Sequence, residues 1–112
     1  MTAAPESKSF GGMNMTITKN KDGEKLTLAL NGRLDTVSSP LLETALKEDA
    51  DGISELELDF SELAYISSAG LRVLLSAQKA MAGKGSMTIR NVCPDIMEIF
   101  EITGFSDILT IA

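Results

Sequence analysis

Residues 58–75 read LDFSELAYISSAGLRVLL, and the rest of the chain is interpreted outward from them. From Leu56 to Phe60, apolar side chains alternate with acidic ones, which predicts a strand over residues 53–60. Leucines then recur at the three- and four-residue spacing of a helical face, which predicts a helix over residues 69–82. The segment is therefore expected to pass from a strand through a short turn into a helix.

Two serines, Ser67 and Ser68, stand where this helix should begin. A serine oxygen at that position can accept a hydrogen bond from one of the first unpaired backbone N–H groups, which is helix capping. The start of a helix also tolerates a phosphate, because the helix dipole places partial positive charge there. From spacing alone, both interpretations stay open, and capping is the more common one.

Before this segment, residues 13–32 predict a β-hairpin that turns at Asp22-Gly23. Gly32 is expected to end its second strand, and residues 33–36 are expected to form a loop. Ser39 is then the predicted cap and Pro40 the first residue of a helix that runs to about residue 50.

After the central segment, residues 86–91 predict a short strand, and Pro94 should open a helix that ends at Thr103-Gly104. Residues 107–111 predict one more short strand or an extended tail. The predicted fold class is α/β, with a mixed four- to five-stranded sheet opened by a β-hairpin and helices packed on one face. One domain is expected over residues 13–112, after a disordered tail over residues 1–12.

The composition of the chain argues against several classes of function. The net charge of −6 argues against a nucleic-acid partner, and the absence of histidine removes histidine bases and histidine metal sites. The single cysteine, Cys93, agrees with a reducing cytoplasm. No apolar run approaches the roughly 20 residues that cross a bilayer. We therefore expect a cytoplasmic binding or regulatory module rather than an enzyme, a monomer without cofactor or metal and without a membrane partner.

The segment Leu63-Ala-Tyr-Ile-Ser-Ser-Ala-Gly-Leu71 resembles the STAS domain, specifically the bacterial anti-sigma-factor antagonists. A second match is Asn31-Gly-Arg-Leu-Asp35, which is similar to the family's Gly-x-Leu-Asp loop. The resemblance implies that Ser68 is phosphorylated by a partner that is both anti-sigma factor and serine kinase. It also implies release of the partner on phosphorylation and a separate serine phosphatase that resets the switch. The family often has an aspartate before the phosphorylated serine, where this chain has Ser67, and Ser67 is the alternative acceptor.

Three further residues near the serines are candidate partner contacts, each with a purely structural alternative. Gly70 would let a partner or phosphate approach the helix start, or would only allow a tight contact between helix and sheet. Asp35 would orient or repel groups near Ser68, or would be a turn residue. Arg72 would touch an acidic partner, or would be a solvated charge.

The expected function is that of a partner-switching regulator of sigma-factor-dependent transcription. The alternative is a STAS-like interaction scaffold in a transporter or another multi-protein assembly, without a sigma factor. An enzyme would need an acid–base pair, for which Asp35, Asp59 and the two serines are the only nearby candidates.

Overall fold

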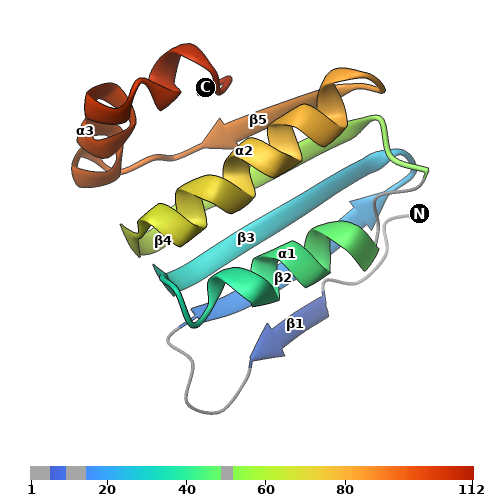
Figure 1. The fold of residues 1–112 in the computed structure, drawn as a ribbon. Helices are drawn as coiled ribbons and strands as arrows, with labels where there is room; N and C mark the ends of the chain where they lie inside the picture. The colour runs from blue at the N-terminus through green and yellow to red at the C-terminus, as the bar shows by residue number, and fades with distance from the viewer. Residues whose placement is uncertain (1–5, 10–14, 49–51) are drawn as a thin grey trace.

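The computed structural model describes residues 6–9, 15–48 and 52–112, which form a five-stranded sheet and three α-helices (Figure 1). The strands occur in the sheet in their order along the chain. They are β1 (Glu6–Ser9), β2 (Met15–Asp22), β3 (Lys25–Leu34), β4 (Glu55–Ile66) and β5 (Ser86–Arg90). The helices are α1 (Ser39–Glu48), α2 (Ser68–Ala82) and α3 (Pro94–Thr103), followed by the 3-10 turn η1 (Phe105–Asp107).

The sheet is mixed, as predicted. Strands β1, β2 and β3 pair antiparallel, whereas β3, β4 and β5 pair parallel through the two helical connections. The predicted β2–β3 hairpin is confirmed, and Gly23 supplies the positive φ of 63° that its tight turn requires. A disordered tail was predicted over residues 1–12, but residues 6–9 form β1. The rest of that tail, 1–5 and 10–12, lies outside the described residues.

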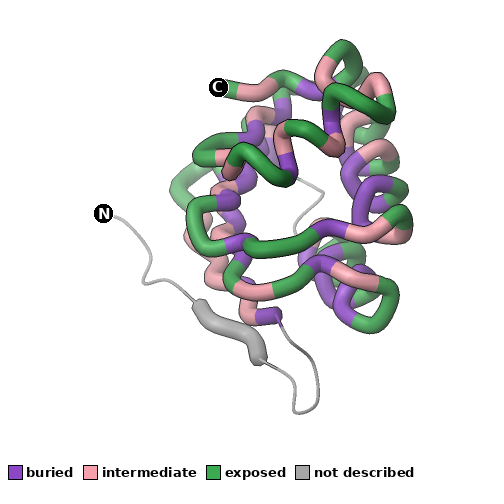
Figure 2. Tube along the Cα trace, turned by 90° about the vertical axis from the view of Figure 1, so that its left-hand side faces the viewer, coloured by how far each residue is buried: buried purple, intermediate pink, exposed green. Residues whose placement is uncertain are grey.

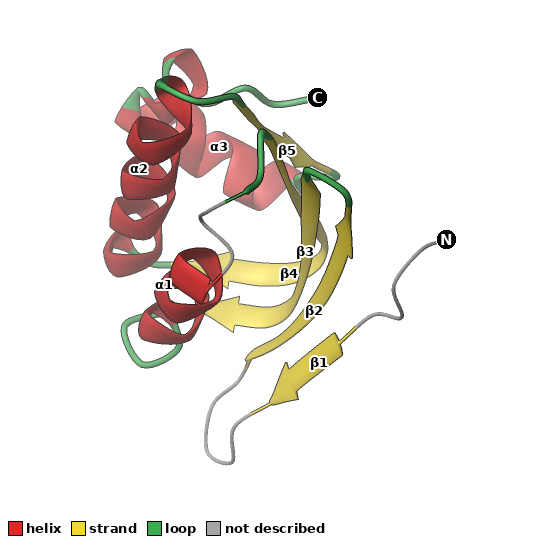
Figure 3. Cartoon of the chain, turned by 90° about the vertical axis from the view of Figure 1, so that its right-hand side faces the viewer, coloured by secondary structure: helices red, strands yellow, loops and turns green. Residues whose placement is uncertain are grey.

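All three helices cover the same face of the sheet, which confirms the predicted architecture (Figure 3). Alternate residues of β3 and β4 point into the layer between sheet and helices, where the buried residues gather (Figure 2). Phe60 of β4 meets Phe100 of α3 there, with ring centroids 6.5 Å apart. The opposite face carries polar and charged side chains, such as those of Lys25 and Glu57, which form an ion pair of 3.1 Å.

Two predicted strand ends are wrong. Strand β3 does not stop at Gly32 but runs on to Leu34, because Gly32 takes a φ of 113° at a bulge and pairing resumes after it. Strand β4 continues past Phe60 to Ile66, since the longer β3 offers it a partner up to the Leu34–Ile66 pair. Both strands therefore finish next to the serines.

Two further expectations change at the helix α1 and at the C-terminus. Helix α1 begins at Ser39, so Ser39 is its first residue rather than its cap, and Pro40 is the second residue. Its predicted last residues, 49 and 50, lie outside the described part of the chain. In place of a terminal strand over 107–111, the structure has η1 and a single parallel bridge between Ile89 and Ile111.

Candidate functional site

The candidate site lies at the edge of the sheet where β3 and β4 end together. Leu34 and Ile66 are the last paired residues, and the Ser67 N–H donates to the Leu34 carbonyl oxygen at 2.9 Å. The loop that begins at Asp35 and the start of α2 therefore share one edge, as expected for two adjacent parallel strands. The sequence motif around Asp35 and the serine motif are thus brought together, although more than 30 residues separate them.

The two serines of the central segment have different environments. Ser67 is the N-cap of α2, with φ −101° and ψ 175°, and its oxygen accepts a hydrogen bond of 3.3 Å from the Gly70 N–H. Ser68 is the first helical residue and is exposed. Its hydroxyl makes no hydrogen bond to any other residue of the described ranges. The cap and the available hydroxyl are consequently two different residues.

Gly70 lies in the first turn of α2 and is buried. A Cβ atom built on it would lie 2.8 Å from Leu34 Cγ and 2.9 Å from Ile66 Cγ1, which is too close for either contact to stay in place. The missing side chain lets the start of α2 rest directly on the ends of β3 and β4. The tight helix–sheet contact foreseen as the structural alternative is therefore present at Gly70, beneath the site rather than on its surface.

Asp35 turns its carboxylate into its own loop. One oxygen accepts hydrogen bonds from the N–H groups of Val37 and Ser38, each at 3.0 Å, and it lies 3.1 Å from the Ser38 hydroxyl oxygen, whose proton is donated to the Arg33 carbonyl oxygen. The Ser38 N–H is the largest of the causes that lower the pKa of this carboxyl below its ordinary value. Asp35 thus shapes the β3–α1 loop, which is the turn role considered for it.

Sequence reasoning missed Ser38, the residue that completes this loop. Its side chain is fully buried; the hydroxyl donates to the Arg33 carbonyl oxygen at 2.6 Å and accepts from the Asp35 N–H at 2.9 Å. The neighbouring Ser39 hydroxyl donates to the Asp35 carbonyl oxygen at 2.6 Å. The spacing Asp35-x-x-Ser38 is a signal that would have pointed to this turn, since aspartate and serine favour such local bonds.

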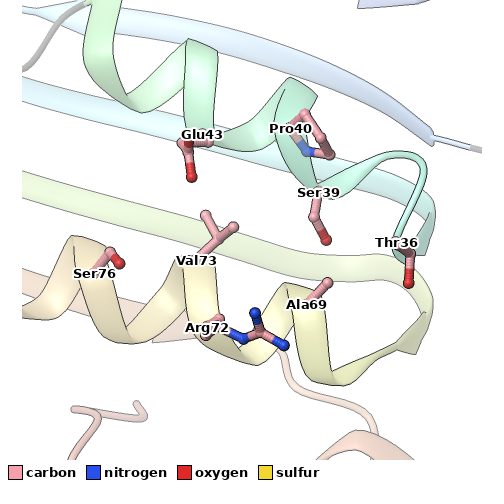
Figure 4. Close-up of a pocket in the computed structure, with 8 residues that line it drawn as sticks. All are labelled: Thr36, Ser39, Pro40, Glu43, Ala69, Arg72, Val73 and Ser76. Atoms are coloured by element: carbon pink, nitrogen blue, oxygen red, sulfur yellow. The ribbon is translucent and has the colours of Figure 1, made fainter.

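A groove of about 250 Å³, lined by Ala69 next to Ser68, opens between the N-terminal halves of α1 and α2 (Figure 4). Arg72 lies on its α2 side, and Glu43 lies opposite on α1. The exposed Arg72 side chain extends beside Ala69, toward the start of α2 (Figure 4). The other residues that line the groove are Thr36, Ser39, Pro40, Ala69, Val73 and Ser76.

Neither a cluster of metal-ligating side chains nor a membrane-spanning helix occurs in the part of the chain that the structure describes. Across residues 6–9, 15–48 and 52–112, no three cysteine, aspartate or glutamate side chains gather where they could hold a metal ion. No helix in these ranges combines the length and the apolar character that crossing a membrane requires. The chemistry that the site offers is that of an exposed hydroxyl beside a shallow groove with one basic and one acidic side chain.

Several known proteins are similar to this chain in sequence. The family model described as "Mlab, STAS domain" matches residues 17–110. BtrV of Bordetella bronchiseptica, which is described by its name as a candidate anti-sigma factor antagonist, is 36% identical to this chain over 100 residues. The match covers 88% of this chain and 86% of BtrV. An anti-sigma-B factor antagonist of Listeria monocytogenes is 31% identical over 103 residues, and the match covers 88% of this chain and 90% of the Listeria protein.

Solved structures agree in fold. An anti-sigma factor antagonist from Mycobacterium paratuberculosis superposes with a TM-score of 0.79 at 20% identity, covering 87% of this chain and 84% of that one. The Bacillus cell fate determinant SpoIIAA, in its phosphorylated form, superposes with a TM-score of 0.66 at 16% identity, covering 97% and 91%. The chain therefore belongs to the STAS-domain family, among its anti-sigma-factor antagonists.

Proposed function

We propose that this protein is a cytoplasmic partner-switching regulator whose switch is Ser68. Without phosphate it binds, as a monomer, an anti-sigma factor that is also a serine kinase, so that the sigma factor is free to direct transcription. Phosphorylation of Ser68 by that partner releases the protein from the partner. A serine phosphatase then removes the phosphate and restores binding. The observation that supports this proposal best is the exposed Ser68 hydroxyl, which has no partner among the described residues, beside a Ser67 that already caps the helix.

The chemical step uses what the partner brings. The Ser68 oxygen forms a bond to the γ-phosphorus of ATP, the bond between that phosphorus and the β-γ bridging oxygen breaks, and ADP leaves. The hydroxyl proton passes to a base of the kinase. ATP and its magnesium ion belong to the kinase, so this chain acts as the substrate and needs no cofactor. Modification of Ser67 would instead compete with the hydrogen bond that it accepts from Gly70.

The added charge is expected to act on docking rather than on folding. A phosphoserine carries about −1.5 to −2 charges at neutral pH. At the start of α2 the helix dipole favours negative charge, typically by about 0.3–1 kcal/mol. A partner seated over the same helix end would have to desolvate this group or meet it with like charge, which costs several kcal/mol. The fold should therefore persist while the complex dissociates.

The test begins with a pull-down from the source cells, followed by mapping of the phosphate on the recovered protein and calorimetry with the captured partner. Ser68→Ala should bind as tightly as the wild type and resist phosphorylation, whereas Ser68→Asp should bind at least about tenfold more weakly, which is about 1.4 kcal/mol. Ser67→Ala, the control, should still be phosphorylated. If the phosphate maps elsewhere and both Ser68 variants bind equally, the switch is absent. Equal recovery of a transport assembly by both variants would favour the scaffold function instead.

A further inference from the structure

Arg72 lies one helical turn beyond Ser68 on the exposed surface of α2. Side chains four residues apart on a helix are neighbours, with Cβ atoms about 5–6 Å apart. Helical side chains also lean toward the N-terminus, and Arg72 does so beside Ala69 (Figure 4). A group attached to the Ser68 oxygen would therefore lie within reach of the Arg72 guanidinium.

The three arginines of the chain differ in the interaction partners that their side chains already have. The Arg33 guanidinium carbon lies 4.1 Å from the centroid of the Tyr65 ring, and Arg90 pairs with Glu57 at 3.5 Å. Arg72 has no ion pair or ring contact within the described ranges. The carboxylate across the groove, Glu43, is bound to Lys47 at 3.4 Å, one turn further along α1. Arg72 is thus the arginine that can take a new anion without losing an existing partner among the described residues.

We propose that Arg72 binds the phosphate of phosphorylated Ser68 and holds it against the first turn of α2. This inference rests on the proposed phosphorylation of Ser68. An acidic group four residues before a basic one is the favourable order on a helix, and a guanidinium can meet phosphate oxygens with two parallel hydrogen bonds. Phosphorylation would then change the docking surface in two ways. It adds negative charge, and it engages the arginine beside the groove so that this side chain no longer contacts the partner.

The pairing can be measured without any kinase, on full-length protein in which phosphoserine is incorporated at position 68 during translation. The ³¹P chemical shift is followed against pH at low ionic strength. If Arg72 pairs with the dianion, the second phosphate ionisation should have its midpoint about 0.2–0.4 of a pH unit lower than in the same protein carrying Arg72→Gln. Salt near 1 M should remove most of this difference, since the site is exposed.

Arg33→Gln is the matched control, because it removes an arginine from the neighbouring strand end that faces Tyr65 instead. It should leave the midpoint unchanged. Equal midpoints for wild type and Arg72→Gln, or a shift caused by Arg33→Gln alone, would overturn the pairing. Neither result would touch the proposed switch, which is judged by partner binding and phosphosite mapping. Conversely, a cell in which Ser68 is never phosphorylated would refute the switch and leave the measured pairing intact.

Discussion

Two helices of this protein begin with a serine pair at the same edge of the sheet, and the two pairs have opposite roles. Ser38 and Ser39 at α1 are buried, with exposed fractions of 0% and 3%, and both hydroxyls donate to backbone carbonyl oxygens. At α2, Ser67 caps the helix, while Ser68 is exposed and makes no side-chain hydrogen bond to another described residue. The same dipeptide is structural in one place and available for chemistry in the other.

The connecting chain explains the difference. Between β3 and α1, the loop folds around the Asp35 carboxylate, which accepts hydrogen bonds from the N–H groups of Val37 and Ser38. This turn places the Ser38 side chain in a buried position. Between β4 and α2, only Ser67 separates strand from helix, so no loop is left to cover Ser68. A hydroxyl at a helix start is therefore available when the connection is too short to enclose it. The following predictions test this contrast between the two pairs.

The largest loss of stability is expected for Ser38→Ala. It removes the buried hydroxyl that bonds the partly buried Arg33 carbonyl oxygen and Asp35 N–H, and leaving such groups unpaired typically costs about 1–3 kcal/mol. Urea denaturation followed by circular dichroism measures the free energy of unfolding. Thr44→Ala, at an exposed hydroxyl of α1, is the control and should stay within about 0.5 kcal/mol. Equal stability of the two variants would contradict a structural role for the first pair.

Gly70→Ala should also destabilise the protein, by a net amount of about 1 kcal/mol. The new methyl group would press on Leu34 and Ile66 at less than 3 Å, and overpacking typically costs about 1–3 kcal/mol, against a helix-propensity gain of about 1 kcal/mol. Gly83→Ala is the matched control, since nothing lies within 4 Å of its Cβ position and its φ is −93°. If both variants gain stability, α2 does not need the close approach that brings Ser68 to the edge.

Within the second pair, Ser67→Ala should lower the free energy of unfolding by about 1 kcal/mol, because it removes the cap of α2. Ser68→Ala should change it by less than about 0.5 kcal/mol, because its hydroxyl has no partner in the described structure to lose. Thermal unfolding of both variants and the wild type under the same conditions measures these two changes. A larger loss for Ser68→Ala than for Ser67→Ala would reverse the assignment of cap and acceptor.

The smallest effect is expected from the acid titration of Asp35. Because the pKa of its carboxyl is lowered in the folded protein, its contribution to stability is complete above the ordinary value of 3.8. The contribution is then lost as the pH falls below that value and through the lower folded pKa. Asp35→Asn should therefore show a smaller loss of stability between pH 6 and pH 3 than the wild type in urea denaturation. An identical acid response of Asp35→Asn and wild type would exclude this role of the Asp35 carboxylate.

Most element types were predictable because their signals are local. The alternation around Leu58, the Asp-Gly turn and the leucine spacing after residue 70 each follow from the geometry of one strand, turn or helix. The ends of β3 and β4 were not predictable, since each strand extends only as far as its neighbour pairs with it. The cap of α1 was misassigned for a related reason: Ser38 is drawn inward by a carboxylate that the loop brings to it.

The sequence by itself determined the α/β order, the resemblance to anti-sigma-factor antagonists and the two serines as the place to look. It did so because backbone periodicity and a short motif are properties of neighbouring residues. Only the tertiary structure decided that Ser67 is the cap, that Ser68 is exposed, that Asp35 serves its own loop and that Gly70 lies beneath the site. These are matters of burial and of contacts between distant segments, and they exist only once β3 and β4 end side by side.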